Sequence, residues 1–253
     1  MIIRGIQIDS FIGNRLSNED YADVFINQQQ QLMAVLCDGM GGHNGGEVAS
    51  RQAVEQLGDL WKTTEISNQD ELTSWIVTSI NQVNEAIYQA GLEQSDLAGM
   101  GTTLVAMFCL EKTIIIANVG DSRAYIVNRQ HQVEQITEDH SYAHELFLRG
   151  EITKQEELNH QQRHMLTRSL GVGQTIEVDL FQKELTDIRY VFLCSDGLSN
   201  NLSDNEILSI LNQETCSNAV KSQALIDQSY KNGSNDNISI VLIDMDQMQE
   251  GGS

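Results

Sequence analysis

The sequence predicts an α+β fold in which helices and strands are grouped in blocks along the chain. Two amphipathic helical segments occur together within residues 46–91, and four short apolar segments follow one another within 102–137. One-by-one alternation of strands and helices would instead favour a parallel sheet with helices on both faces. With 253 residues and no Pro/Ser-rich linker or internal repeat, the chain can bury one sizeable core. We therefore expect a single layered domain over 1–246, followed by a flexible tail or cloning remnant over 247–253.

Apolar residues that recur at helical spacing indicate four helices, over about 46–61, 68–91, 203–211 and 218–230. The clearest of them begins with a capping box formed by Asn68 and Glu71, and Gly91 is its expected stop. Ser203 and Glu206 form a second capping box. The first two helices follow one another directly, so we expect them to lie side by side.

Short apolar runs bounded by Gly or by polar turns indicate strands. We expect them over about 32–37, 102–109, 113–119, 123–128, 133–137, 176–184, 190–195 and 238–244. The strands within 102–137 have tight connections, which predicts an antiparallel meander. Between about 141 and 168 the chain is polar and helix-prone.

Acidic residues stand at the ends of several predicted strands. Asp38 and Asp196 each follow an apolar run and precede a Gly, which lets the backbone turn sharply and approach an ion closely. Asp121 and Asp236 occur in similar settings, so these acids could converge on one rim. Oxygen ligands without Cys or several His suit Mg²⁺ or Mn²⁺ better than zinc. Carboxylates crowded together repel one another unless cations neutralise them, and the sequence therefore predicts a metal site.

The net charge of −21 argues against nucleic-acid or anionic-membrane partners, because no basic run compensates for it. No apolar run approaches the roughly 18 residues that cross a bilayer, and the N-terminus lacks the features of a secretory signal. These features favour the cytoplasm. An anionic substrate would need local positive charge, which bound cations would supply.

Six motifs occur in a fixed order along the chain. They are Gly13-Asn14-Arg15-Leu16-Ser17-Asn18-Glu19-Asp20, Asp38-Gly39-Met40-Gly41-Gly42-His43, Gly101-Thr102-Thr103, Gly120-Asp121-Ser122-Arg123, Ser195-Asp196-Gly197 and Asp236-Asn237. A single Asp-Gly pair carries no information, whereas the ordered set covers residues 13–237. With these motifs the chain resembles the metal-dependent protein phosphatases, the type 2C serine/threonine phosphatases (PPM family), in their bacterial form.

The resemblance implies a four-layer αββα sandwich, in which two antiparallel sheets are flanked by pairs of helices. It implies that Asp38 bridges two Mn²⁺ or Mg²⁺ ions and that the Gly39 carbonyl binds the second of them. Asp196 and Asp236 would complete the site of the first ion.

Further residues receive roles from the same resemblance. Glu19 would approach the second ion directly or through water, and Asp20 would hold metal-bound waters. Asp121 together with Asp196 matches a third ion site of bacterial members. Arg15 would clamp the phosphoryl oxygens, and the alternative for that side chain is a surface salt bridge to Glu19 or Asp20.

The implied activity is hydrolysis of phosphoserine and phosphothreonine esters in proteins, by in-line attack of a hydroxide that bridges the two ions. A cognate Ser/Thr kinase is the implied partner, and we expect a monomer. Eukaryotic members commonly place a His directly after the Asp-Gly pair as general acid. Here Met40 takes that place and His43 lies three residues on, so a general-acid role and a structural role for His43 stay equally open.

Two other functional classes match parts of the pattern. A catalytically silent relative would bind phosphoproteins without turnover, but it would be expected to lack at least one of Asp38, Asp196 and Asp236. A metal-dependent nuclease or small-phosphoester hydrolase shares the two-ion chemistry. Such an enzyme would need a basic nucleic-acid track or a deeper apolar pocket.

The segment over about 141–168 corresponds to the variable flap of the family. The flap region contains His140, His144, His160 and His164 together with four Arg or Lys residues, so it is the most basic part of an acidic chain. The simplest interpretation is exposed polar side chains on a mobile segment. We also hypothesise that the flap attracts anionic phosphopeptides and that its hold weakens as pH rises through the histidine range.

Overall fold

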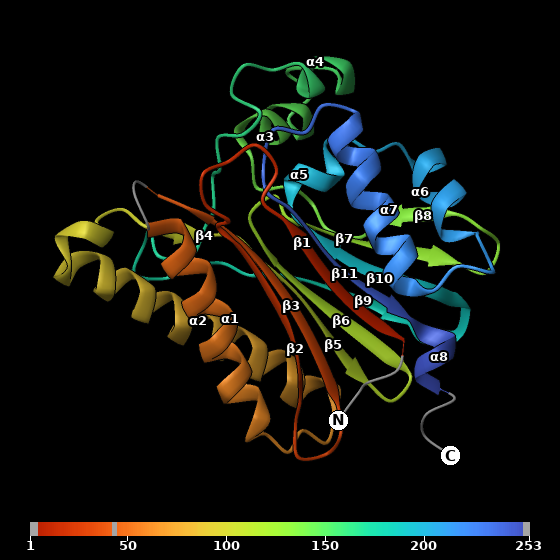
Figure 1. Cartoon of the computed structure of the whole chain (residues 1–253). Coiled ribbons are helices and arrows are strands. Elements are labelled where there is room, and N and C mark those ends of the chain that lie inside the picture. The colour runs from red at the N-terminus through yellow and green to blue at the C-terminus, as the bar shows by residue number, and fades with distance from the viewer. Residues whose placement is uncertain (1–4, 42–44, 250–253) are drawn as a thin grey trace.

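The protein is built from two antiparallel sheets that pack face to face, with helices on both outer faces (Figure 1). The computed structural model describes residues 5–41 and 45–249. Each sheet packs helices against its outer face and apolar side chains against the other sheet. The predicted α+β class and the four-layer αββα order are therefore confirmed.

The first sheet has five strands in the order β1-β11-β10-β7-β8. These are β1 (Ile6–Phe11), β11 (Ile238–Asp244), β10 (Ile188–Cys194), β7 (Arg123–Asn128) and β8 (Val133–Gln135). The helices on its outer face are α5 (Asp196–Ser199), α6 (Asp204–Leu211) and α7 (Asn218–Lys231). Leu211 of α6 and Leu225 of α7 belong to the same buried cluster as Tyr190, Phe192 and Leu242 of the sheet.

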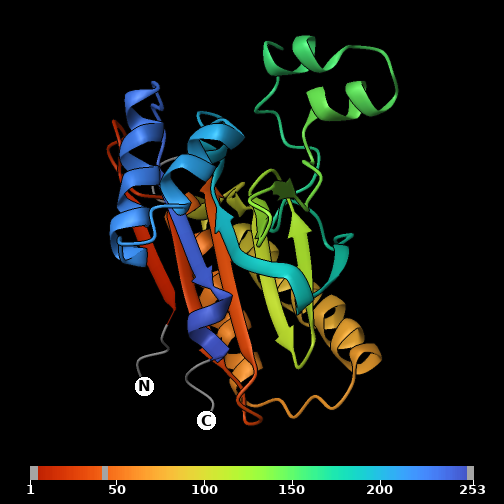
Figure 2. The ribbon, with the colours of Figure 1, turned by 90° about the vertical axis from the view of Figure 1, so that its right-hand side faces the viewer.

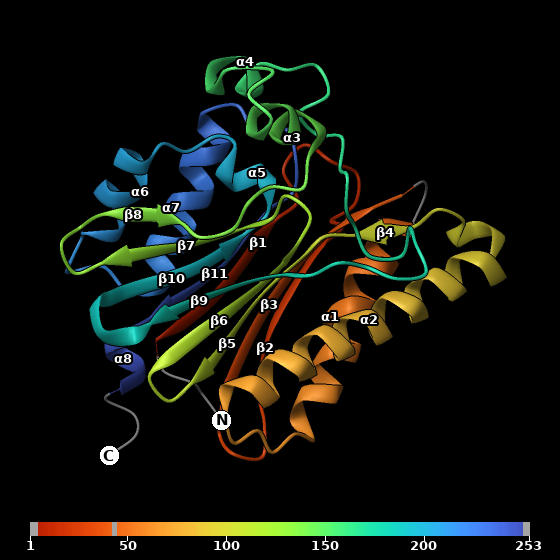
Figure 3. The same cartoon turned by 180° about the vertical axis from the view of Figure 1, so that it is seen from behind.

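The second sheet has the strand order β2-β3-β5-β6-β9, and a short strand β4 also pairs with β3. These are β2 (Asp20–Ile26), β3 (Leu32–Met40), β4 (Gly101–Thr102), β5 (Leu104–Leu110), β6 (Thr113–Val119) and β9 (Asp179–Glu184). The helices α1 (Gly45–Lys62) and α2 (Gln69–Glu93) lie on its outer face (Figure 3). Trp61 of α1 packs there against Trp75 of α2 and Phe108 of β5, with ring centroids 5.1 and 5.4 Å away.

The space between the sheets is filled by a core to which both sheets contribute. In β3, Leu36 faces this core, whereas Val35 faces the helices α1 and α2. Leu193 and Val241 belong to the first sheet and share the core with Leu36. Burial of β3 on both faces explains why residues 32–37 form a continuous apolar run.

The strands within 102–137 do not form the predicted meander. β5 pairs with β6 in one sheet and β7 pairs with β8 in the other, so the chain crosses between the sheets after β6. Gly120 makes this crossing with φ +108°, and a Cβ there would lie 2.6 Å from the side chain of Thr103. The crossing lets each pair of strands bury a face that a single sheet would leave to solvent. Asp121 follows directly, between β6 of one sheet and β7 of the other.

Two further strands and one helix end differ from the expectation. β1 and β2 are absent from the predicted elements, because both are only partly buried along most of their length. Helix α2 continues past Gly91 to Glu93, since an isolated Gly costs only about 1 kcal/mol within a helix. Single-turn 3₁₀ helices occur at Ser95–Leu97 and Leu185–Asp187. No helix in the described ranges is both long and apolar enough to span a membrane.

Residues 247–249, expected to begin a flexible tail, instead belong to the short helix α8 (Met245–Gln249). Met248 packs against the core between the sheets, and Asp246 pairs with Arg129 at 2.7 Å. Residues 250–253 lie outside the described part of the chain.

The flap stands apart from the sandwich (Figure 2). It holds two short helices, α3 (Tyr142–Leu148) and α4 (Lys154–Leu158). Its ends are joined, because Ser141 and Leu166 form an antiparallel bridge and the Tyr142 N–H donates to the Met165 carbonyl at 2.8 Å. The flap therefore enters and leaves the fold at one place.

Replacing Trp61 with Ala should lower the free energy of unfolding by about 3–5 kcal/mol, because the indole is fully buried between α2 and β5. Urea denaturation followed by circular dichroism measures the change. Val77 of α2 is exposed, so Val77→Ala is the matched control and should stay within about 0.5 kcal/mol of the parent. Equal stability of the two variants would contradict the packing of the helices on the second sheet.

Candidate active site

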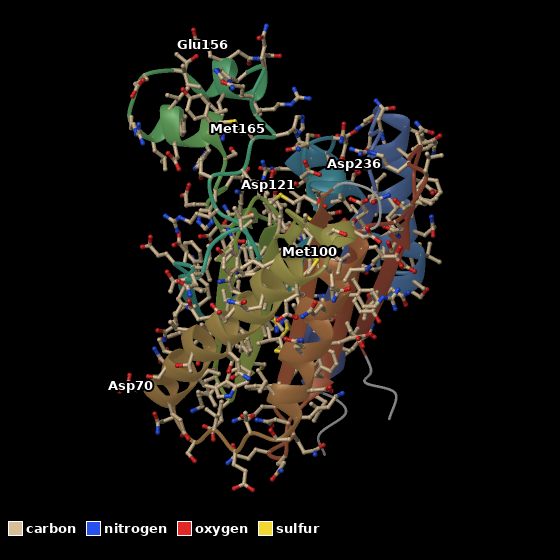
Figure 4. All side chains as sticks on the ribbon, turned by 90° about the vertical axis from the view of Figure 1, so that its left-hand side faces the viewer. Asp70, Met100, Asp121, Glu156, Met165 and Asp236 are labelled. Atoms are coloured by element: carbon tan, nitrogen blue, oxygen red, sulfur yellow. The ribbon has the colours of Figure 1, made fainter. Side chains whose placement is uncertain are left out.

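A cleft of about 1300 Å³ opens at one end of the sandwich. Its walls come from segments far apart in the sequence, namely the loop after β1, the ends of β3 and β10, and much of 163–176. Figure 4 shows Asp121 and Asp236 at this end, below the flap that carries Met165. Most of the predicted site residues line the cleft: Arg15, Glu19, Asp38, Gly39, Asp121, Asp196 and Asp236.

Asp20 is buried behind this group and stands opposite Asp38 on the paired strands β2 and β3. Its Oδ2 accepts a hydrogen bond from the Ser195 hydroxyl at 2.8 Å, and that hydroxyl accepts from the Ser239 N–H at 3.0 Å. The other oxygen, Oδ1, has no hydrogen-bond partner among the described residues. A buried carboxylate oxygen without a donor is costly, so this atom is suited to a bound water or cation.

The backbone of Asp38 is held by the segment that precedes β5. Its N–H donates to the Thr103 hydroxyl at 2.9 Å, and its carbonyl accepts from the Thr103 N–H at 2.8 Å. The Thr102 hydroxyl donates to the same carbonyl at 2.9 Å. Thr103 is also 2.7 Å from the Ser122 hydroxyl, next to Asp121. These bonds couple the positions of the two carboxylates.

Close backbone contacts around Gly39 explain why this position lacks a side chain. The Gly39 N–H donates to the Glu19 carbonyl at 3.0 Å. A Cβ on Gly39 would lie 2.0 Å from the carbonyl oxygen of Gly46, in the first turn of α1. A Cβ on Gly46 would lie 2.4 Å from Glu19 Oε2, so the carboxylate of Glu19 sits against the start of this helix. Burial raises the pKa of Glu19, which the hydrogen bond from Ser17 and the charge of Arg15 partly offset.

Asp196 and Asp236 approach the cleft from the first sheet. Asp196 follows β10 and opens α5, and its Oδ2 accepts from the Asn200 amide at 3.2 Å. A Cβ on Gly197 would lie 2.0 Å from the Asn237 carbonyl oxygen, so the two segments touch through their backbones. The Asn237 side chain accepts from the Glu19 N–H at 2.8 Å. This bond joins the two segments to the loop that carries Glu19.

Arg15 forms a salt bridge with a different acid from the two considered for it. Its Nη2 lies 2.6 Å from Asp236 Oδ2, and its Nε donates to the Asn235 carbonyl at 3.3 Å. The Arg15 side chain is 56% exposed, so most of its donors face the cleft or solvent. The alternative of a salt bridge to Glu19 or Asp20 is therefore wrong, because Arg15 pairs with Asp236. The phosphoryl contact of Arg15 stays a prediction.

The carboxylates repel one another strongly in this arrangement. The pKa of Asp38 is raised well above its ordinary value by burial and then by four neighbouring charges, those of Asp20, Asp196, Asp121 and Asp236. Burial followed by Asp196 raises the pKa of Asp121 in the same way. Burial raises the pKa of Asp20 to about 7, although the hydrogen bond from the Ser195 hydroxyl opposes the shift. Neighbouring charges shift a pKa in this way only when the carboxylates lie close together.

This donor set fits a hard divalent cation. The groups that face the cleft are carboxylate and carbonyl oxygens, which suit Mg²⁺ or Mn²⁺. Within residues 5–41 and 45–249, no three His, Cys, Asp or Glu side chains are already gathered closely enough to hold one ion. Both cations usually keep several waters, so carboxylates spread around a wide cleft remain suitable ligands.

His43 lies outside the described residues, but the flap histidines can be placed. His140 is buried: its Nδ1 accepts from the Gly120 N–H at 3.0 Å, so its Nε2 carries the proton that faces Asp179 at 3.1 Å. Burial lowers the pKa of His140, which keeps it neutral. The His140 ring thus holds the backbone turn at Gly120, which positions Asp121. Nothing local in the sequence distinguishes this histidine, because its partners come from two distant segments.

His144 is also buried, with Glu157 Oε1 and Glu138 Oε2 each 2.6 Å from its ring nitrogens. The interpretation of exposed histidines is therefore wrong for His140 and His144. His164 is 55% exposed, and its Nδ1 lies 3.3 Å from Asp196 Oδ2. Through His164 the flap contacts the acidic cluster.

Comparison with known proteins identifies the family. A model described as protein phosphatase 2C matches residues 9–229 of the chain. The chain belongs to the protein phosphatase 2C family. This 2C phosphatase is 40% identical to the serine/threonine phosphatase stp of Listeria monocytogenes over 238 residues, which are 94% of each chain. It is 34% identical to the protein phosphatase PhpP of Streptococcus pneumoniae over 92% of this chain and 94% of that protein.

Solved structures agree with this assignment. The 2C phosphatase matches the serine/threonine phosphatase Stp1 of Staphylococcus aureus with a TM-score of 0.90 and 38% identity, over 97% of this chain and 96% of the other. It matches the catalytic domain of the phosphatase PstP in complex with two manganese ions with a TM-score of 0.80 and 31% identity, over 94% and 96% of the chains. The protein is a serine/threonine protein phosphatase of the bacterial 2C type.

Replacing Gly39 with Ala in the phosphatase should lower the free energy of unfolding by about 1–3 kcal/mol, because the added methyl overlaps the backbone of α1. Thermal and urea unfolding measure the loss. Gly173 also lines the cleft, but its added methyl would meet the nearest atom at an ordinary 3.5 Å. Gly173→Ala should therefore stay within about 0.5 kcal/mol of the parent, and a reversed order of the two variants would refute the close contact.

Proposed function

We propose that this phosphatase hydrolyses phosphoserine and phosphothreonine esters in proteins, using two Mn²⁺ or Mg²⁺ ions held in the acidic cleft. The observation that carries the proposal is the gathering of buried, mutually repelling carboxylates from both sheets at one end of the sandwich. Two bound ions would supply a hydroxide nucleophile at neutral pH and would neutralise charge in an in-line displacement.

The residues that would hold the ions come from both sheets. Asp38 would bridge them, with the Gly39 carbonyl and Glu19 on the side of α1. Asp196 and Asp236 would bind from the opposite side. This division follows from the fold, because β3 and β10 bring their last residues to the same cleft from different sheets.

Asp20 and Asp121 would act around this core. Asp20 has a free Oδ1 and would hold waters on the ions. The charge of Asp196 raises the pKa of Asp121, and these two carboxylates would bind a third, weaker ion. His140 would set the position of Asp121 through the Gly120 N–H.

Arg15 would orient the phosphoryl group. A guanidinium has five donors, and Asp236 and the Asn235 carbonyl occupy only part of them. The remaining N–H groups would donate to phosphate oxygens, which favour bidentate contact with Arg. Arg163 and Arg168 of the flap region also line the cleft and would attract an anionic peptide.

Further features of the proposal concern the cellular setting. We propose one phosphatase domain over 1–246, which works as a monomer in the cytoplasm and opposes a cognate Ser/Thr kinase. A catalytically silent role is disfavoured, because Asp38, Asp196 and Asp236 are all present around the cleft. A nuclease role is disfavoured by the net charge of −21.

Replacing Asp38 with Asn should reduce turnover of p-nitrophenyl phosphate and of a phosphothreonine peptide by about 10³-fold or more, because the bridge between the ions is lost. Asp121→Asn should cost about 10- to 100-fold and leave two ions bound. Calorimetric titration with Mn²⁺ separates these effects from activity.

The matched control is Asp227→Asn, which removes an exposed carboxylate on α7 and should change neither turnover nor Mn²⁺ binding. Turnover that persists in a chelator, or an Asp38→Asn variant that keeps full activity, would overturn the proposed mechanism.

The metal-free protein should lose stability as pH rises from about 4 to about 7. Within this window Asp20, with its pKa raised from 3.8 to about 7, keeps its proton in the folded chain and loses it in the unfolded chain. The folded state then binds more protons, so its stability falls with rising pH. Asp20→Asn should flatten this dependence in thermal unfolding measured with a chelator.

Mn²⁺ should reverse the trend, because metal ligands must be deprotonated. The rise in Tm that saturating Mn²⁺ gives should be larger near about pH 8 than near about pH 5. A rise that is independent of pH would exclude the buried carboxylates as the ligands.

A further inference from the structure

A second pocket, of about 400 Å³, lies far from the cleft. It is formed by the turn between β7 and β8, the start of β10, α7 and α8. The cleft receives the opposite end of β10, where Asp196 follows the strand. Figure 1 accordingly shows α8 at the end of the sandwich away from α3 and α4. The two pockets share no residue.

Lys221 is the unusual feature of this second pocket. It is 4% exposed, and its ammonium donates to the Tyr190 hydroxyl at 2.7 Å. No carboxylate in the described part of the chain forms an ion pair with it. Lysine is almost never fully buried without a partner of opposite charge, because desolvation of the ammonium is costly. The pocket therefore contains a buried lysine whose amino group pairs with no carboxylate of the described residues.

Two arginines add to this positive charge. Arg189 lies over the Tyr190 ring, with its Cζ 5.2 Å from the ring centroid, and it pairs with Asp246. Arg129 pairs with the same Asp246 carboxylate at 2.7 Å. Arg189 also pairs with Asp244 at 3.5 Å, but two carboxylates cannot use all the donors of two guanidinium groups, each of which has five. Unused donors of both arginines therefore remain beside Lys221.

Basic side chains are concentrated at this pocket, although the chain as a whole is acidic. The lining holds three of them, Arg129, Arg189 and Lys221, together with the carboxylates of Glu214 and Asp246, and Asp244 outside the lining pairs with Arg189. The protein as a whole has a net charge of −21. Three basic side chains gathered at one pocket of so acidic a chain indicate a site for an anion.

We propose that this pocket binds a small phosphate-bearing anion. A tetrahedral phosphate has enough oxygens to accept from the Lys221 ammonium and from both guanidinium groups at once. The volume lies within the range of small-molecule sites, and the Tyr190 ring and Leu211 provide an apolar wall for an organic substituent. The ligand is either free phosphate or a small phosphate ester, and neither requires the metal ions of the cleft.

Titration of ¹⁵N-labelled protein with inorganic phosphate, in the presence of a chelator, tests this site. Amide signals of Tyr190 and Lys221 should shift, and they should do so independently of Gly39 and Gly197 in the cleft. Lys221→Gln and Arg129→Gln should each weaken binding about tenfold, as expected for loss of one charge-assisted hydrogen bond. Arg129 is partly exposed, so its variant leaves the core intact if Lys221→Gln impairs folding.

Two further variants sharpen the test. Lys231→Gln removes an exposed cation in the last turn of the same helix α7 and should leave binding unchanged. Asp246→Asn removes the carboxylate that competes for both arginines and should strengthen binding. Phenylphosphonate, which cannot be hydrolysed, distinguishes the two sources: tighter binding than phosphate assigns the pocket to esters, and weaker binding assigns it to free phosphate.

Specific outcomes would overturn the proposal. Shifts confined to the cleft, or equal affinity of the parent and both weakened variants, would exclude the site. Equal shifts with chloride at the same ionic strength would mean an adventitious ion only.

Discussion

Like charges buried at the junction of two sheets are the constraint on which the rest of this structure depends. Each carboxylate there raises the cost of ionising the others, and burial adds to that cost. The surrounding protein supplies neutral donors rather than countercharges: the Ser195 hydroxyl serves Asp20, and threonines hold the backbone of Asp38. The acids are thus fixed in place while their charge is left for a ligand to balance. Arg15 beside Asp236, and Arg123, whose charge lowers the pKa of Asp121, are exceptions.

Much of the fold could be predicted because several strands are buried on both faces. Residues 32–37 and 190–194 are continuous apolar runs for this reason, but the strands extend beyond these runs, β3 forward to Met40 and β10 back to Ile188. β1 escaped prediction because it is an edge strand in which polar and apolar residues alternate around Ile6 and Ile8. The prediction of a meander was wrong because a tight connection has the same sequence pattern whether it joins neighbouring strands of one sheet or crosses to another sheet. Only the packing of the second layer decides between them.

The residues of the site were predictable, whereas their contacts were not. Short motifs placed the acids at strand ends, and all of them lie in or beside one cleft. The partner of Arg15, Asp236, lies 221 positions away in the sequence. No local pattern could therefore indicate it. Burial of His140 and His144 depends on carboxylates of other segments in the same way. Polar composition suggested an exposed surface because composition does not record such pairing.

The manner in which the flap joins the sandwich has an evolutionary consequence. Its two ends are bridged at Ser141 and Leu166, and no strand of either sheet passes through it. A segment attached in this way can be lengthened, shortened or exchanged without changing the register of any strand. The sandwich and the flap can therefore diverge at different rates, so that the flap can change while the catalytic frame is kept.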